Sequence, residues 1–160
     1  MWRSRPRSAE ALARPPFALL GIDHVVLRVR DLDRSLDFYC RVLGCEVERR
    51  VEALGLVQLR AGRSLIDLVP VSGPLGRAGG APPAEEGRNL DHFALALDRF
   101  DEALLRAHLA AHGVEAGPTG ARYGAGGTGP SIYVRDPDGN VVELKGPGDR
   151  EGAPSAGARA

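Results

Sequence analysis

The 160-residue sequence predicts an α+β fold made of two copies of one unit, in which a strand and a helix precede three further strands. The first observation is an internal repeat, because the motif Ile22-Asp23-His24 returns as Leu90-Asp91-His92. The second is that each copy opens an alternating apolar run, typical of a strand, and continues with apolar residues at helical spacing. The third is that turn sequences separate further strand-like runs in each half.

The first half contains one predicted helix and four predicted strands. The helix begins after Asp31 or Asp33, either of which could cap it, and ends at Gly44, a natural stop. Ala61-Gly62-Arg63 reads as a hairpin turn between the last two strands. The strands are expected over residues 22–30, 45–51, 54–61 and 64–71.

The second half repeats this order. A strand is expected over residues 90–97, a helix over 100–112, and a short strand over 114–116. Residues 117–130 are too rich in glycine to assign. Residues 131–135 and 140–145 form a predicted hairpin around Asp136-Pro137-Asp138-Gly139, where Pro and Gly suit a type I turn with a glycine bulge.

The composition sets the domain boundaries. An arginine-rich segment, residues 1–20, is expected to be a disordered leader, with a transit peptide or an over-long start as alternatives. The Gly/Pro/Ala-rich residues 72–88 read as a linker or a loop over a site. Residues 146–160 are expected to form a disordered tail. One domain, residues 21–145, is therefore predicted, with modules over 21–71 and 89–145.

The charge balance argues against some classes of partner. Lys and Arg together number 21, and so do Asp and Glu, so we expect no nucleic-acid partner. No apolar run approaches the roughly 20 residues that span a bilayer, so we expect no membrane partner. Cys40 and Cys45 fit neither a disulfide scaffold nor a zinc knuckle. A reducing cytoplasm is the expected location.

Four strand residues, one His and one carboxylate from each repeat, predict a metal site. They are His24, Asp67, His92 and Glu143. Each imidazole lies on the strand face opposite the most hydrophobic residues, and each carboxylate interrupts an apolar strand, which is costly unless it is exposed, paired or metal-bound. Such ligands suit Ni, Zn, Fe, Mn or Co. The alternative is four unrelated solvent-facing residues, but the repetition of both positions favours the metal.

Residues 21–145 resemble the vicinal oxygen chelate superfamily, which includes glyoxalase I, extradiol dioxygenases, fosfomycin-resistance enzymes, methylmalonyl-CoA epimerase and bleomycin-resistance proteins. The resemblance implies paired βαβββ modules whose curled mixed sheets surround a metal. It rests on Ile22-Asp23-His24, on Leu36-Asp37-Phe38-Tyr39 with Leu43-Gly44, on Leu90-Asp91-His92, and on the run from Asp136-Pro137-Asp138-Gly139 to Glu143-Leu144.

The resemblance also implies roles for individual residues. His24, His92 and Glu143 fall on the usual metal positions, and Glu143 is the implied catalytic base of a glyoxalase-like lyase or isomerase. Its small substrate would chelate the metal through neighbouring oxygens. Asp67 falls where glyoxalase I has a Glu ligand, so this shorter side chain could bind the metal, reach it through water, or only orient another ligand. A homodimer is expected, and the ligands could come from one chain or two.

Tyr133 supports a second interpretation. With Asp136-Pro137, Gly139 and Glu143 it resembles the end of the extradiol dioxygenase signature, and across a hairpin it could face the same cavity as Glu143. An Fe(II) dioxygenase is therefore an alternative, although the His expected upstream of Tyr133 is missing. Tyr133 could instead be a packing aromatic. A metal-free binding protein of the bleomycin-resistance kind is the third interpretation.

The glycine-rich segment 124–129 suggests a loop at the border of the site. Arg122 and Tyr123 precede it and are candidate substrate contacts. His108 and His112 lie four residues apart on the second helix, but the segment between them lacks the Glu of a zincin, which favours an ordinary surface face.

Overall fold

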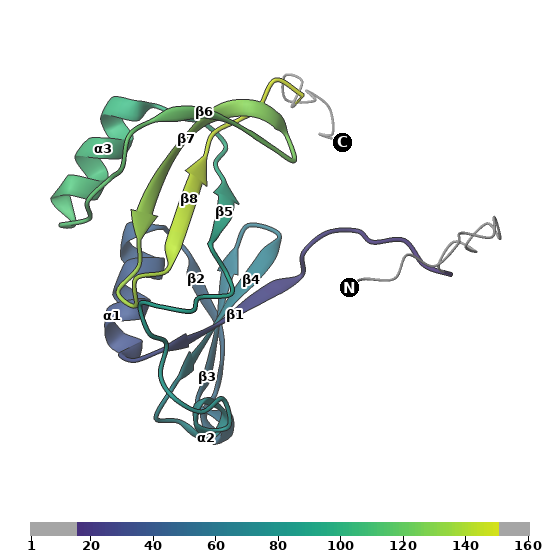
Figure 1. Ribbon diagram of the computed structural model, residues 1–160, viewed down its shortest axis with the longest axis vertical. Coiled ribbons are helices and arrows are strands. Elements are labelled where there is room, and N and C mark those ends of the chain that lie inside the picture. Colours follow the sequence, from purple (N-terminus) through teal and green to yellow (C-terminus); the bar gives the residue numbers. More distant parts are fainter. Residues whose placement is uncertain (1–15, 151–160) are drawn as a thin grey trace, which may run out of the picture.

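The computed structural model describes residues 16–150, and the first module forms a four-stranded mixed sheet (Figure 1). The strand order is β1-β4-β3-β2, in which β1 and β4 run parallel and the other neighbours antiparallel. Its elements are β1 (His24–Val29), α1 (Leu32–Leu36), the π-helix η1 (Asp37–Val42), β2 (Glu46–Val51), the 3₁₀ helix η2 (Glu52–Leu54), β3 (Leu56–Ala61) and β4 (Ser64–Pro70).

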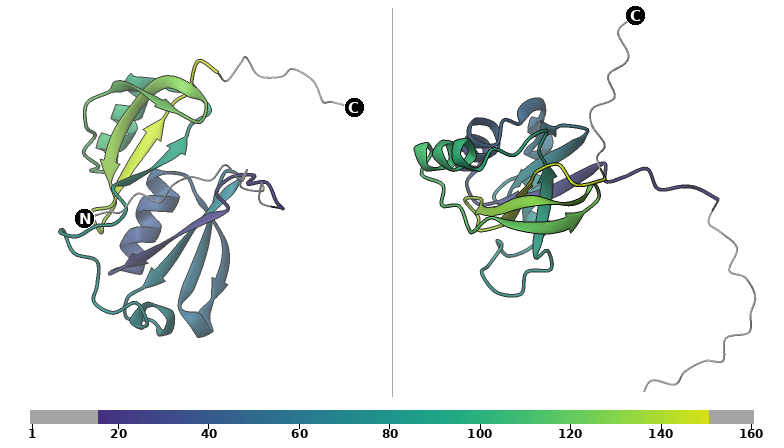
Figure 2. Two further views of the ribbon diagram at one scale, coloured as in Figure 1. Left: turned by 45° about the vertical axis from the view of Figure 1, so that its right-hand side comes forward. Right: turned by 90° about the horizontal axis from the view of Figure 1, so that it is seen from above.

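The second module repeats this topology in the order β5-β8-β7-β6, with β5 and β8 parallel. The two sheets remain separate, and neither closes into a barrel (Figure 2). The predicted α+β fold of two βαβββ modules with mixed sheets is confirmed. The remaining elements are α2 (Pro74–Arg77), β5 (His92–Ala96), α3 (Glu102–Ala111), β6 (Gly120–Gly124), β7 (Gly127–Arg135) and β8 (Val141–Lys145).

Aspartates cap the first helix of each module. Asp31 accepts a hydrogen bond from the Arg34 backbone amide at 3.0 Å, and Asp101 accepts one from Leu104 at 3.0 Å. Helix α1 continues as the π-helix η1, at whose end the Leu43 amide donates a hydrogen bond to the carbonyl of Phe38, five residues earlier.

No helix within residues 16–150 is long and apolar enough to cross a membrane.

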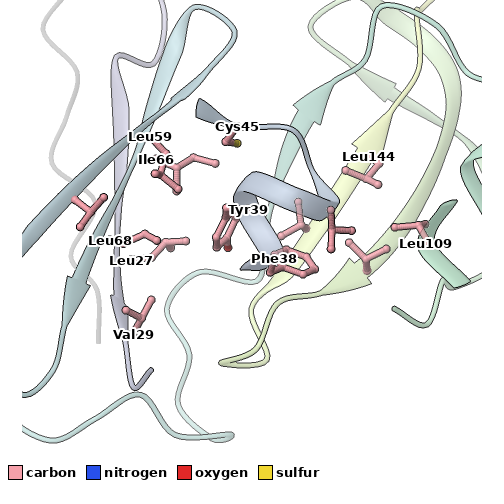
Figure 3. Packing of buried hydrophobic residues seen from close by; sticks show 14 of the residues in the cluster. Leu27, Val29, Phe38, Tyr39, Cys45, Leu59, Ile66, Leu68, Leu109 and Leu144 are labelled. Carbon is pink, nitrogen blue, oxygen red and sulfur yellow. The ribbon is translucent and has the colours of Figure 1, made fainter. Parts of the chain in front are cut away.

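One hydrophobic core lies between the two sheets, and the first helical segment fills its centre (Figure 3). Tyr39 is fully buried there and Phe38 is 5% exposed. The β1 and β4 side chains of the core come from alternate positions, as do those of β7 and β8, because one face of each sheet turns inward. These residues are Leu27, Val29, Ile66 and Leu68 from the first sheet and Ile132, Val134, Val142 and Leu144 from the second.

Two buried carboxylates of the β7–β8 turn connect the modules. Tyr39 donates its hydroxyl hydrogen bond to Oδ2 of Asp136 at 2.7 Å, and the backbone amide of Arg30 donates to Oδ1 of Asp138 at 3.1 Å. Burial, followed by the charge of Asp136, raises the pKa of Tyr39 well above its usual range. The predicted turn is confirmed, with a Gly139 φ of 80° and a bond from the Gly139 amide to the Asp136 carbonyl.

The structure corrects three local predictions. Residues 114–116 form no strand, and the second strand of this module is instead β6, which arises within the unassigned glycine-rich segment. The expected linker contains α2, and three carbonyls of residues 76–81 bind the Arg28 guanidinium. A tail beginning at Gly146 is too early, because the Gly146, Asp149 and Arg150 amides hydrogen-bond to β7 and the β6–β7 turn. Residues 1–15 and 151–160, which contain most of the expected leader and tail, lie outside the described residues.

Replacing Tyr39 with Phe should lower the free energy of unfolding by about 1–3 kcal/mol, because the buried Asp136 would lose a hydrogen-bond donor. Urea denaturation of the two proteins measures this difference. Tyr123→Phe is the matched control, since that ring is 67% exposed, and should change stability by less than about 0.5 kcal/mol. Equal effects of the two substitutions would refute the structural role of the Tyr39 hydroxyl.

Candidate metal centre

The second sheet brings His92 and Glu143 together. They lie on adjacent parallel strands, β5 and β8, on the face opposite the core. Nε2 of His92 is 3.4 Å from Oε2 of Glu143. Glu143 is only 6% exposed, and its Oε1 is buried without a hydrogen-bond partner among the described residues. We call this pair the second half-site.

Asp91 orients the imidazole of this half-site. Its Oδ2 lies 2.7 Å from Nδ1 of His92. A carboxylate can only accept in this contact, so Nδ1 carries the hydrogen; in the neutral ring Nε2, which faces Glu143, then keeps its lone pair. A metal-binding histidine is commonly held in this way by a carboxylate on its other nitrogen.

The first sheet contains the corresponding residues, His24 on β1 and Asp67 on β4, which we call the first half-site; unlike His92 and Glu143, these two side chains form no ion pair. Nδ1 of His24 is 2.7 Å from Oδ1 of Asp23, as in the repeat. This hydrogen bond raises the pKa of His24, burial opposes the shift, and the charge of Asp67 adds to it. Asp67 is 4% exposed and accepts a bond from Nε2 of Gln58 at 3.0 Å, while its Oδ1 is buried without a partner among the described residues.

The four predicted ligands do not meet within one chain. Each half-site lies on the sheet face opposite the shared core, so the two half-sites point in opposite directions, away from the core. Among residues 16–150, no group of three or more His, Cys, Asp or Glu side chains is placed to hold a metal ion. The structure therefore groups the four residues as two pairs, one on each sheet, and the four-ligand metal site stays a prediction.

The donor chemistry of each half-site fits a divalent metal. A buried carboxylate oxygen without a donor costs free energy, which a cation bound to it would recover. Both half-sites contain one such oxygen, Oδ1 of Asp67 and Oε1 of Glu143, on the same sheet face as an imidazole whose Nε2 makes no hydrogen bond within the described residues. Imidazole and carboxylate ligands suit the first-row metals predicted from the sequence.

Tyr133 lies on the same open face as the second half-site. It pairs with Glu143 across β7 and β8, and its ring centroid is 5.3 Å from that of His92 in an edge-on arrangement. The guanidinium carbon of Arg122 lies 4.5 Å above the Tyr133 ring. Tyr133 thus links the candidate metal ligands to a cation on β6.

The two predicted substrate contacts lie apart. Arg122 reaches the open face, whereas Tyr123 follows it in β6 and so points to the other side, where its ring lies 5.2 Å from Arg150. On α3, His108 donates from Nε2 to the carbonyl of Val42 at 2.8 Å, and its ring lies 4.5 Å from that of His112 at a tilt of 48°. His108 connects α3 to the first helical segment, whereas His112 bonds only to the carbonyl of His108, as expected of an ordinary surface face.

Four residues of these faces escaped the sequence-based assignment. The aspartate before each histidine is itself repeated, and this repetition was the available signal for Asp23 and Asp91. Gln58 and Lys145 carried no such signal, because their roles depend on cross-strand pairing.

Two surface cavities open away from the half-sites. One of about 510 Å³ lies beside the β7–β8 turn, and one of about 490 Å³ lies between α1 and the end of α3. Neither is lined by a residue of either half-site. Both half-sites lie on the sheet faces opposite the core.

Comparison with known proteins identifies the family. The model of the Glyoxalase/Bleomycin resistance protein/Dioxygenase superfamily matches residues 21–144. The chain belongs to this superfamily. This agrees with the resemblance drawn from the repeated Asp-His motifs and with the paired-module fold.

Individual members of the superfamily differ in their named activities. A lactoylglutathione lyase from Escherichia coli O157:H7 is 35% identical over 127 residues, covering 76% of this chain and 88% of the relative. A catechol-2,3-dioxygenase from Bacillus subtilis is 31% identical over 124 residues, covering 77% of this chain but only 40% of that protein. An integron cassette protein from the mobile metagenome of V. cholerae has a similar structure, with a TM-score of 0.62 and 26% sequence identity. The match covers 81% of this chain and 97% of that protein.

Replacing Glu143 with Gln should raise the free energy of unfolding of the metal-free protein by about 1 kcal/mol, because a buried charge with an unpartnered oxygen is removed. Asp136→Asn is the matched control. Asp136 is also buried, but it accepts bonds from Tyr39, Asp138 and Asn140, so its substitution should destabilise. Denaturation in the presence of a chelator measures both. A Glu143→Gln protein as unstable as Asp136→Asn would show that Glu143 is compensated in the folded chain.

Proposed function

We propose that the protein is a metal-dependent lyase or isomerase of the glyoxalase type, acting on a small substrate that chelates the metal through neighbouring oxygens. The observation that carries the proposal is the repeated pairing of an oriented imidazole with a buried carboxylate that has an unpartnered oxygen. Such an uncompensated group costs stability and is typical of functional sites. The lactoylglutathione lyase relatives favour this reaction class.

The proposed ligands are His24, Asp67, His92 and Glu143. A bound divalent metal would supply Lewis acidity, which stabilises negative charge on the substrate oxygens. Asp23 and Asp91 hold the imidazoles in the tautomer that leaves Nε2 free. Glu143 is the proposed base, because its Oε1 has no competing donor among the described residues and the residue lies on the sheet face opposite the core. It would take a proton from one substrate carbon and return it to the neighbouring atom.

A second copy of the chain would complete the site. The half-sites look away from each other within one chain, so the first half-site of one copy can meet the second half-site of its partner. A two-fold dimer of this kind contains two equivalent four-ligand sites. Exposed apolar residues border the open faces and would be covered by such a contact, including Ile22 at 74%, Val26 at 53% and Leu90 at 48% exposure.

His92→Ala should abolish stoichiometric metal binding, because the second half-site loses its nitrogen ligand. Elemental mass spectrometry of the untagged protein, before and after reconstitution with Ni, Zn, Fe, Mn or Co, measures this loss. His112→Ala is the matched control, since that histidine lies on α3 and bonds only within the helix, and it should bind metal like the wild type. A wild-type protein that takes up no metal would refute the enzymatic proposal and leave a metal-free binding module.

A heterodimer of His24→Ala and His92→Ala chains should bind a single metal ion, because one of its two crossed sites keeps both half-sites intact. Differently tagged chains purified in tandem provide the heterodimer, and each variant alone should bind none. If each site came from one chain, the heterodimer would bind no metal. A monomeric wild type at all concentrations would also contradict the crossed arrangement.

Tyr133 favours one alternative, an Fe(II) dioxygenase of the extradiol type. Its ring contacts that of His92 and it faces Glu143 across the strands, so it could act on a substrate bound at the metal. The dioxygenase relative from Bacillus subtilis is consistent with this activity. If the reconstituted protein retained only Fe and consumed oxygen when a catechol was added, the dioxygenase would be favoured over the proton-transfer enzyme.

A further inference from the structure

We infer that the open face of the second sheet contains an anion-binding subsite, formed by Arg122 and Lys145 around Ser131, and that the substrate is a small acid. The inference rests on the proposed function, because the subsite lies beside the half-site of His92 and Glu143. It defines the chemical class of the substrate as a carboxylate or a phosphonate-like anion that also carries metal-chelating oxygens.

Arg122 is held in place while one edge of its guanidinium stays free. Nη1 donates to the carbonyl oxygen and to Oγ of the fully buried Ser131, at 3.1 and 2.9 Å. The ring of Tyr133 lies beneath the group. Neither Nε nor Nη2 makes a hydrogen bond within the described chain. These two donors form the fork that binds a carboxylate or phosphonate bidentately.

Lys145 supplies a second positive charge without a counter-ion. It is only 8% exposed, and its Nζ makes one hydrogen bond, to the carbonyl of Arg122 at 2.7 Å. An ammonium group has three donors, so two remain available. Neither Arg122 nor Lys145 forms an ion pair with a described carboxylate, and both of their anchoring partners are neutral oxygens. A half-buried pair of like charges is costly until an anion binds between them.

The strand register places the anion-binding subsite beside the second half-site. Lys145 and Glu143 lie on the same face of β8, two residues apart, which separates them by about 7 Å. Ser131 pairs with Lys145, and Tyr133 pairs with Glu143, so the subsite and the half-site occupy neighbouring pairs on one face of the ladder, separated by the inward-facing pair Ile132 and Leu144. A ligand that reaches both therefore lies along one face of the second sheet.

A glycine makes room for the lysine. A Cβ built on Gly124 would lie 2.6 Å from Cε of Lys145, so any larger residue would displace this side chain. Gly124 does not have a positive φ, so the backbone accepts alanine. Gly124→Ala therefore moves the ammonium group while it preserves the net charge.

The test is a titration of the metal-free, full-length protein with methylphosphonate and, separately, with acetate. The NMR signal of the Arg122 Nε–H group and the backbone amides of β6 and β8 report binding. We expect saturable shifts at these positions, and an affinity about tenfold weaker in Arg122→Met, Lys145→Met and Gly124→Ala. Arg99→Met removes an exposed charge outside the sheet and should leave the affinity unchanged. The anion that binds more tightly identifies the planar or the tetrahedral class.

Metal content measured on the same samples separates this inference from the proposed function. NMR shifts that are confined to the subsite on anion titration support the anion-binding subsite, whether or not the protein takes up metal. If metal binds stoichiometrically but neither anion shifts the Arg122 signal, the subsite is refuted and the metal enzyme stands. An equal loss of affinity in the Arg99→Met control would also refute it, because binding would then follow net charge alone.

Discussion

The hydrogen bond between the Tyr39 hydroxyl and Asp136 determines how the two modules face each other. Tyr39 belongs to the first helical segment and Asp136 to the turn of the second sheet, and both are buried. A buried carboxylate is tolerated only when donors surround it, so this contact specifies one packing of the modules. Because the core-facing sides of both sheets are thereby occupied, the remaining two faces must look outward. The proposed metal ligands and the proposed anion subsite lie on these outward faces.

The two half-sites are chemically similar because the repeat preserves three spacings. An Asp precedes each His, the His opens a strand, and the carboxylate lies on the parallel neighbour of that strand. Strand geometry then brings the imidazole and the carboxylate to the same face without further specification. The difference lies in length and contacts. Asp67 accepts a hydrogen bond from Gln58, whereas Glu143 extends one methylene further and lies 3.4 Å from Nε2 of His92; each carboxylate keeps one oxygen without a partner among the described residues.

Most of this could be predicted from the sequence, and the exceptions have physical causes. His24, His92 and the type I turn follow from local patterns that a strand or a turn imposes. β6 was missed because its alternate residues include Gly120 and Gly124, which give no apolar periodicity. The outward direction of the half-sites could not be predicted from the sequence either, because it depends on the burial of Tyr39 between the modules. Lys145 could be recognised only after its cross-strand neighbours were known.

The distribution of charge shows how the duplicated sheets have diverged. On the first sheet Arg60 forms two hydrogen bonds with Glu48, so its charge is neutralised within the sheet. On the second sheet Arg122 and Lys145 bond only to neutral oxygens, and their charge stays available. Both sheets can therefore contribute ligands to a metal, and the second sheet also carries the proposed anion-binding residues. In a crossed dimer, one chain would thus supply both the base Glu143 and the anion-binding residues of each site, while its partner would supply His24 and Asp67.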